Sequence, residues 1–141
     1  MPDKRTSNRG FTLIELLIVM IIIGLLASLV GPKLFQKVGG AKQKTARAQI
    51  ELIGTALDSY RLDVGKYPTT EQGLEALREK PQTVDAWDGP YLPKDVPLDP
   101  WGNEYIYKSP GDHGDYDLVS YGFDGQPGGE DEDQDIQSWT N

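Results

Sequence analysis

Phe11 and Glu15 have residue types and a spacing that could do chemistry at the edge of a membrane. Glu15 is the one ionisable residue in the apolar run FTLIELLIVMIIIGLLASLV, which extends from Phe11 to Val30. An ionisable group inside a membrane segment is costly, so it is by default a functional hypothesis whose partner should be named. A cut between Gly10 and Phe11 would create an α-amino group one helical turn from Glu15. We expect these two charges to pair, preferably between neighbouring subunits.

The length of this apolar run predicts a transmembrane helix. At 1.5 Å per residue, the run from Phe11 to Val30 spans about 30 Å, which is the thickness of the hydrocarbon core of a bilayer. The basic residues Lys4, Arg5 and Arg9 precede it and should stay on the cytoplasmic side. The chain beyond about residue 32 is therefore expected on the opposite side of the membrane.

Alternative interpretations of this N-terminal segment remain open. A secretory signal peptide and an unprocessed membrane anchor also combine a basic start with an apolar middle. The run is longer than a typical signal-peptide core, and LLASLVGP offers no good small-residue cleavage site. Gly10 favours processing at the start of the run instead, because glycine lets a peptidase approach the backbone closely. For Glu15, the alternative to pairing is a side chain that extends to the membrane interface.

The acidic segment from Asp124 to Asp135 is the second candidate for chemistry. It carries six carboxylates in twelve residues, with several glycines among them. Ca²⁺ accepts six to eight oxygen ligands in flexible geometry, so this composition suits it. The spacing is not that of an EF-hand, because Gln126 and Gly128 stand where that loop has Asp or Asn. A solvated, disordered tail is the alternative that composition alone favours.

The rest of the composition disfavours nucleic-acid binding and catalysis. The net charge is −8 and no Lys or Arg follows Lys108, whereas phosphate binding needs clustered cations. The chain has no cysteine, and it contains neither a GxSxG nor a GxxxxGK motif. The single histidine, His113, lies in a GDHGD turn that indicates a surface loop. We therefore expect neither a nucleic-acid partner nor an enzyme.

Beyond the membrane run, the pattern predicts a small α+β domain. An apolar stripe at three- and four-residue steps extends the helix to about Leu62, whereas Gly39 and Gly40 leave open whether it bends. The segment 66–81 predicts a short second helix capped by Thr69 or Thr70. Residues 105–107 and 116–121 have strand patterns, which together predict a long helix packed on a small antiparallel sheet. The stripe consists of Ile50, Ile53, Leu57 and Tyr60.

The segment RGFTLIELLIVMIIIGLLASLVGPKL resembles the class III signal of type IV pilins and pseudopilins. That family has a basic leader ending in Gly, then Phe, Thr and Glu at fixed positions, and a Pro after about twenty apolar residues. The resemblance implies that a prepilin peptidase cleaves after Gly10 and N-methylates Phe11. It also implies a helical filament in which Glu15 faces the Phe11 amine of another subunit, and a helix that loosens between Gly24 and Pro32 on assembly. The matching residues are Gly10, Phe11, Thr12, Leu13, Ile14, Glu15 and Pro32.

Three later segments narrow the resemblance to the G-type major pseudopilins of type II secretion systems. They are GKYPTTEQGLEAL, DPWGNEYIYKSPG and YDLVSYGFDGQPGGEDEDQDIQSW. The resemblance implies a type IV pilin-like fold with a cleaved leader (1–10), a transmembrane and assembly helix (11–32) and a periplasmic domain (33–141). It also implies a single-pass protein of the bacterial inner membrane. Its expected partners are other copies, the prepilin peptidase, minor pseudopilins, the inner-membrane assembly platform and membrane lipid.

The same resemblance implies a structural Ca²⁺ in a C-terminal loop. Asp124 and Asp131 match the side-chain ligands of the family, residue by residue. This chain departs from the family in having a large residue at Phe123 and more acids after Asp131. The candidate ligands are the side chains of Asp124, Asp131, Asp133 and Asp135 and the carbonyls of Tyr121 and Phe123.

The leading functional hypothesis is a major structural subunit of a secretion pseudopilus. It would polymerise at the inner membrane and help to drive export of folded proteins through the outer membrane. A type IV pilus subunit is one alternative, disfavoured because such pilins usually carry a C-terminal disulfide loop. A monomeric, membrane-tethered calcium-binding domain is another, but it leaves Gly10, Phe11 and Glu15 unexplained.

Overall fold

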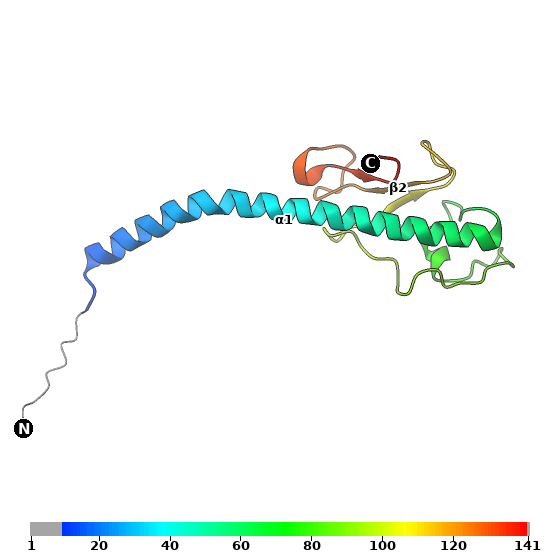
Figure 1. The fold of residues 1–141 in the computed structure, drawn as a ribbon, viewed down its shortest axis with the longest axis horizontal. Coiled ribbons are helices and arrows are strands. Elements are labelled where there is room, and N and C mark those ends of the chain that lie inside the picture. The colour runs from blue at the N-terminus through cyan, green and yellow to red at the C-terminus, as the bar shows by residue number, and fades with distance from the viewer. Residues whose placement is uncertain (1–9, 141) are drawn as a thin grey trace, which may run out of the picture. The chain divides into compact units, whose positions relative to one another are not determined.

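The computed structural model describes residues 10–140, so residues 1–9 of the expected leader lie outside the described residues. The chain divides into two compact units, Met1–Lys37 and Val38–Asn141. One helix, α1 (Leu13–Val64), begins in the first unit and ends in the second (Figure 1). All strands of the described chain belong to the second unit.

Glycines explain where α1 ends and how closely other segments approach it. Gly65 has a φ of +86° and donates its N–H to the carbonyl of Arg61 at 2.7 Å, as in a left-handed helix C-cap. The helix is not interrupted at Gly39 and Gly40. A Cβ atom on the buried Gly39 would overlap the side chain of Glu132, so this glycine makes room for the acidic segment.

The sheet has three short antiparallel strands in the order β1-β2-β3. β1 (Ile106–Lys108) pairs with β2 (Asp117–Ser120), which places Tyr107 opposite Leu118. β3 (Ile136–Gln137) pairs with the other edge of β2, with Ile136 opposite Ser120. Sequence patterns predict β1 and β2 but miss β3, which follows directly after the acidic segment.

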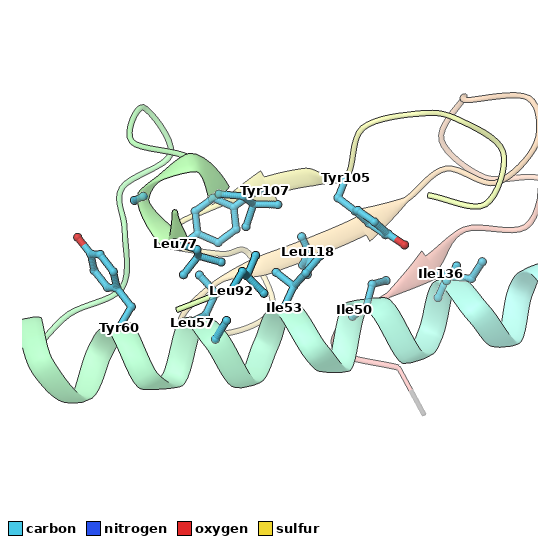
Figure 2. Packing of buried hydrophobic residues seen from close by; sticks show 14 of the residues in the cluster. Ile50, Ile53, Leu57, Tyr60, Leu77, Leu92, Tyr105, Tyr107, Leu118 and Ile136 are labelled. Carbon is cyan, nitrogen blue, oxygen red and sulfur yellow. The ribbon is translucent and has the colours of Figure 1, made fainter. Parts of the chain in front are cut away.

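The core lies between one face of α1 and the sheet (Figure 2). The predicted apolar stripe of α1 is buried, and Ile53, Leu57 and Tyr60 have no exposed surface. Leu77, Leu92 and Leu118 close the core from the opposite side. Burial of a Leu or Ile side chain contributes about 1.5–3 kcal/mol, so this stripe is the main attachment between helix and sheet.

The predicted second α-helix does not form. Thr69 does cap a turn, because its N–H donates to Gln72 Oε1 at 2.9 Å while the Gln72 N–H donates to Thr69 Oγ1 at 3.2 Å. Gly73 then adopts a φ of +61°, which is incompatible with a continuing right-handed helix. The segment 66–81 therefore contains only the one-turn 3₁₀ helix η1 (Leu74–Leu77).

Aromatic stacking and a buried carboxylate hold the C-terminal segment. The Trp139 ring stacks on His113 with centroids 3.9 Å apart, and His113 Nδ1 lies 2.9 Å from Asp117 Oδ2. Burial alone would raise the pKa of Asp117. The His113 side chain and the backbone N–H groups of Asp112 and His113 donate to this carboxylate and hold its pKa below the usual value of 3.8. His113 thus lies in a surface loop as expected, with a structural contact.

This lowered pKa predicts an acid-sensitive contribution to stability. The unfolded chain binds a proton at Asp117 more readily than the folded chain, so the contribution is present above about pH 4 and is lost as the pH falls through the folded pKa. We expect Asp117→Asn to lower the free energy of unfolding by roughly 1–3 kcal/mol at neutral pH and to flatten its acid dependence. Urea unfolding of the full chain in detergent, followed by tryptophan fluorescence at several pH values, measures both effects.

Asp112→Asn is the matched control for Asp117→Asn. Asp112 lies in the turn just before β2, but its side chain is 69% exposed and, within the described residues, pairs only with Lys108 at the surface. Such a pair contributes little, so this variant should keep the acid dependence of the parent chain. Equal acid sensitivity in the Asp117→Asn chain and the parent would contradict the role of Asp117.

Candidate functional site

The candidate processing and assembly residues lie at the start of α1. Gly10 is exposed, and Phe11, two residues before the helix begins at Leu13, is 88% exposed. Thr12 and Glu15 form a reciprocal capping box. The Thr12 N–H donates to Glu15 Oε2, and the Glu15 N–H donates to Thr12 Oγ1, both at 3.2 Å. Gly10, Phe11 and Glu15 therefore belong to one short segment that begins the helix.

The capping role of Thr12 is a feature that the sequence reasoning missed. Its signal is present, because Thr followed by Glu three residues later, before an apolar run, is a capping-box pattern. Within the described residues no group donates to the other carboxylate oxygen, Glu15 Oε1. Glu15 can therefore cap its own helix with one oxygen and still accept a hydrogen bond from a cation with the other.

The apolar part of α1 requires a nonaqueous environment. α1 is long and apolar enough to cross a membrane, and none of its most apolar window is buried within the described chain. Leu13, Ile14 and Met20, for example, are 91%, 65% and 67% exposed. So much exposed apolar surface is unfavourable in water and is expected where lipid or other helices cover it.

The second candidate site is the acidic loop, which we define as residues 121–135. Its two sides meet where the Phe123 N–H donates to the Glu132 carbonyl at 2.9 Å. Gly122 has a φ of +69°, and a Cβ there would lie 2.7 Å from the Glu132 carbonyl oxygen. The Gly128 N–H donates to Asp135 Oδ2 at 2.9 Å and closes the loop further along. This acidic segment is thus an ordered loop rather than a disordered tail.

A buried carboxylate that the sequence reasoning missed holds the base of the acidic loop. Asp99 is 4% exposed, and its Oδ1 accepts from the N–H groups of Trp101 and Asn103 at 3.0 and 2.8 Å. Ser120 donates its hydroxyl to Asp99 Oδ2 at 2.7 Å, and the Asn103 side-chain amide donates to the Gly122 carbonyl at 3.3 Å. An Asp three residues before a turn glycine, as in DPWGN, is the signal that could have indicated this side-chain cap.

The acidic loop contains oxygen atoms that suit a cation, but the predicted ligands are not gathered into one cluster. Within residues 10–140, no group of three or more His, Cys, Asp or Glu side chains is arranged to hold a metal. Asp124 is exposed and accepts from the Gln126 N–H at 3.0 Å, and Asp131 is exposed at a φ of +54°. In contrast, the Oδ1 atoms of Asp133 and Asp135 are buried without any donor. Buried anionic oxygens without donors are costly, so these two fit a hard cation.

The helix start, the exposed apolar run and the small antiparallel sheet together define a filament subunit of the pilin-like class. The profile of the prokaryotic N-terminal methylation motif matches residues 5–31. That of the type II secretion system protein G family matches residues 33–139. The chain belongs to this family and is a major pseudopilin. The family is one of structural subunits, which confirms the expectation that the chain is not an enzyme.

Known relatives are similar in sequence to this chain along nearly its whole length. Type II secretion system core protein G of Pseudomonas aeruginosa is 45% identical over 141 residues, covering 98% of this chain and 99% of the relative. The Vibrio cholerae protein of the same name is 46% identical and covers 97% of this chain and 95% of the relative. The crystal structure of the major pseudopilin from the type 2 secretion system of enterohaemorrhagic Escherichia coli matches with a TM-score of 0.64 at 37% identity. It covers 73% of this chain and 87% of that one.

The close approach at Gly122 predicts that the acidic loop cannot accept a side chain there. Gly122 and Gly125 have similar positive φ values, +69° and +66°, so alanine is strained at both. At Gly125 the added Cβ would meet only Asn103 at 3.7 Å, whereas at Gly122 it would overlap backbone atoms of Glu132 and Asp133. We expect Gly122→Ala to cost roughly 1–3 kcal/mol more than Gly125→Ala. Urea unfolding of both variants measures this difference, and equal costs would contradict the packing.

Proposed function

We propose that this chain is the major subunit that polymerises at the bacterial inner membrane into a type II secretion pseudopilus and helps to export folded proteins. The observation that carries the proposal is the exposed apolar helix that begins at Leu13, two residues after Phe11, with Glu15 in its first turn. Residues 1–10 act as a leader that the prepilin peptidase removes, residues 11–32 as the membrane and assembly helix, and residues 33–141 as the periplasmic domain. Minor pseudopilins and the inner-membrane assembly platform are its proposed partners.

Pairing of Glu15 with a neighbouring subunit gives the membrane helices a reason to assemble. Cleavage after Gly10 leaves a charged α-amino group on Phe11, and N-methylation keeps that charge. A carboxylate in lipid is costly until it finds a cation. Glu15 Oε2 accepts from its own Thr12 N–H, whereas Oε1 is available to the Phe11 amine of another subunit. This arrangement favours lateral contact between processed subunits over contact between unprocessed ones.

Two substitutions separate the charge of Glu15 from its capping role. Glu15→Gln keeps a side-chain oxygen that can cap Thr12 but removes the charge, whereas Glu15→Ala removes both. If pairing drives assembly, both variants should lower the yield of filaments at least tenfold relative to the parent chain. Filaments are counted by electron microscopy after overexpression of the full chain together with the secretion system.

Intact mass spectrometry of the membrane-extracted chains provides the control. Each variant should have lost residues 1–10, because an uncleaved subunit would fail to assemble for a different reason. The parent chain should also carry one added methyl group. Normal filament numbers from the Glu15→Gln chain would contradict the pairing and leave Glu15 only its role in capping the helix. An uncleaved parent chain would contradict the proposed processing.

We further propose that the acidic loop binds a structural Ca²⁺. The side chains of Asp124 and Asp131 and the carbonyls of Tyr121 and Phe123 would supply oxygen ligands. This proposal is supported by the two buried carboxylate oxygens of the loop that lack donors. Bound calcium would reduce the repulsion between the carboxylates of the loop and hold its two sides together. In many small domains a disulfide has this role, but this chain has no cysteine. The remaining candidate ligands are Asp133 and Asp135.

Removal of calcium should lower the melting temperature of the folded chain. An ion that binds only the folded state at about 100 times its Kd stabilises that state by about 2.7 kcal/mol. We expect EDTA to abolish this stabilisation in calcium-loaded full chain in detergent, as measured by tryptophan fluorescence. Asp131→Asn should melt like the EDTA-treated parent and gain nothing from added calcium.

The calcium experiment needs a control for general loss of an exposed carboxylate. Asp85 is exposed and its side chain has no partner among the described residues, so Asp85→Asn should keep the full calcium response. Magnesium at the same concentration tests the selectivity of a flexible, all-oxygen loop for the larger ion. An unchanged melting curve with EDTA, in protein shown to be calcium-loaded by elemental analysis, would count against the site.

A further inference from the structure

A short stretch of α1 beside the acidic loop carries cations that the fold does not neutralise. Lys42, Lys44 and Arg47 lie within two helical turns, and the segment 38–50 contains no acidic residue. None of the three forms a salt bridge within the described chain. Arg47 instead donates to the Thr140 carbonyl at 2.8 Å, and Lys44 is exposed. Lys44 and Arg47 are three residues apart and share one face of α1, whereas Lys42 lies on another. In a chain of net charge −8, a face with two such cations indicates a partner outside the subunit.

The cationic face borders a groove, which we call the basic groove. It has a volume of about 420 Å³ and lies between α1 and the C-terminal segment. Lys44 and Arg47 contribute the positive charge along one wall. Asp135 lines the other wall, but one of its oxygens accepts from the Gly128 N–H and the other is buried. The groove therefore offers two accessible cations to an anionic partner.

We propose that the basic groove binds the acidic loop of a second copy of this chain in the assembled filament. The proposal rests on the filament function and identifies one of its subunit contacts. Charge complementarity carries it, because segment 38–50 has three cations and no acids, whereas the acidic loop has six carboxylates and no cation. Glu130 is the outward-facing carboxylate best suited to this contact, since it is exposed and in no salt bridge among the described residues.

The axial position of the two surfaces is compatible with such a contact. The acidic loop is attached to α1 by the Gln43 side-chain amide, which donates to the Asp131 carbonyl. Gly39 packs against Glu132, one helical turn away. The loop and the basic groove therefore lie at the same level along α1. Parallel neighbours offset along their axes by no more than about one helical turn, roughly 5 Å, would therefore bring the loop of one subunit beside the groove of the next.

Disulfide crosslinking tests the contact directly, because the chain has no cysteine of its own. Lys44→Cys and Glu130→Cys are placed on separate full-length chains with different tags, so that any heterodimer is intermolecular by construction. We expect a crosslinked heterodimer in membranes that contain both chains, under mild oxidation. Lys94→Cys replaces Lys44→Cys in the control, since Lys94 is an exposed lysine far along the chain from the groove. This control pair should give at most a tenth of the heterodimer.

Charge reversal gives a second readout that does not depend on cysteine geometry. Lys44→Glu and Glu130→Lys should each lower filament yield roughly fivefold, the scale of one exposed ion pair, and the combination of both should restore most of it. High salt should narrow the difference between the single variants and the parent. Lys94→Glu is the matched control and should assemble like the parent.

The outcomes separate this contact from the filament function itself. Filaments that form normally without the Lys44–Glu130 crosslink would overturn the docking and leave the function intact, whereas a parent chain that forms no filaments would contradict the function. The competing partner for a basic face near a membrane is anionic lipid. Loss of binding to phosphatidylglycerol vesicles in the Lys44→Glu chain, with no heterodimer and no rescue by Glu130→Lys, would assign the groove to lipid and overturn the proposal.

Discussion

One helix has to satisfy two different solvents, and most other features of the chain follow from that constraint. The first part of α1 is apolar on every side, so it is stable only where lipid or other helices cover it. The part from Ala46 to Tyr60 buries a single apolar stripe and leaves its other faces mostly polar, with Leu52 as an exposed exception. A sheet of three very short strands cannot form a core alone, so the stripe of α1 supplies one wall of it.

The loops of the second unit are fixed mainly by side chains that reach the backbone of distant segments. Tyr107 donates its hydroxyl to the Pro68 carbonyl at 2.8 Å, and burial raises its pKa to about 12. The Trp87 indole donates to the Ala76 carbonyl at 2.7 Å. At the base of the acidic loop, Asp99 joins the nearby N–H groups of Trp101 and Asn103 to the hydroxyl of the distant Ser120. Such bonds take the place of regular structure in a domain with little strand and no disulfide.

The elements predicted correctly from sequence are those with long, regular signals. The long span of α1, its end within two residues of the expected Leu62 and its buried stripe follow from the apolar periodicity. β1 and β2 follow from aromatic and β-branched runs. The failures come from competition between local signals. Thr69 and Gln72 make the hydrogen bonds of a helix cap, but the positive φ of Gly73 prevents the α-helix from forming after it. β3 is too short to have a pattern of its own.

How well each candidate site could be predicted depends on how close its residues are in the sequence. Gly10, Phe11 and Glu15 are close in sequence, so a motif is enough to group them. The ligands of a loop come from segments that meet only after folding, and sequence alone could not show that Asp133 and Asp135 bury an oxygen whereas Asp124 and Asp131 stay exposed. Gly39 is explained only by the approach of a residue more than ninety positions later.

Some carboxylates of the acidic loop point inward and others outward, so the loop could bind a calcium ion and another subunit at the same time. Six carboxylates in one loop repel one another, so an ordered loop needs positive charge from outside it. The Oδ1 atoms of Asp133 and Asp135 are buried and accept no hydrogen bond within the described residues. Glu130 faces solvent, where a cation would be hydrated but a lysine of another subunit can approach. An ion that orders the inner carboxylates would also fix the direction of the outer ones, so calcium binding would strengthen the subunit contact as well as the fold.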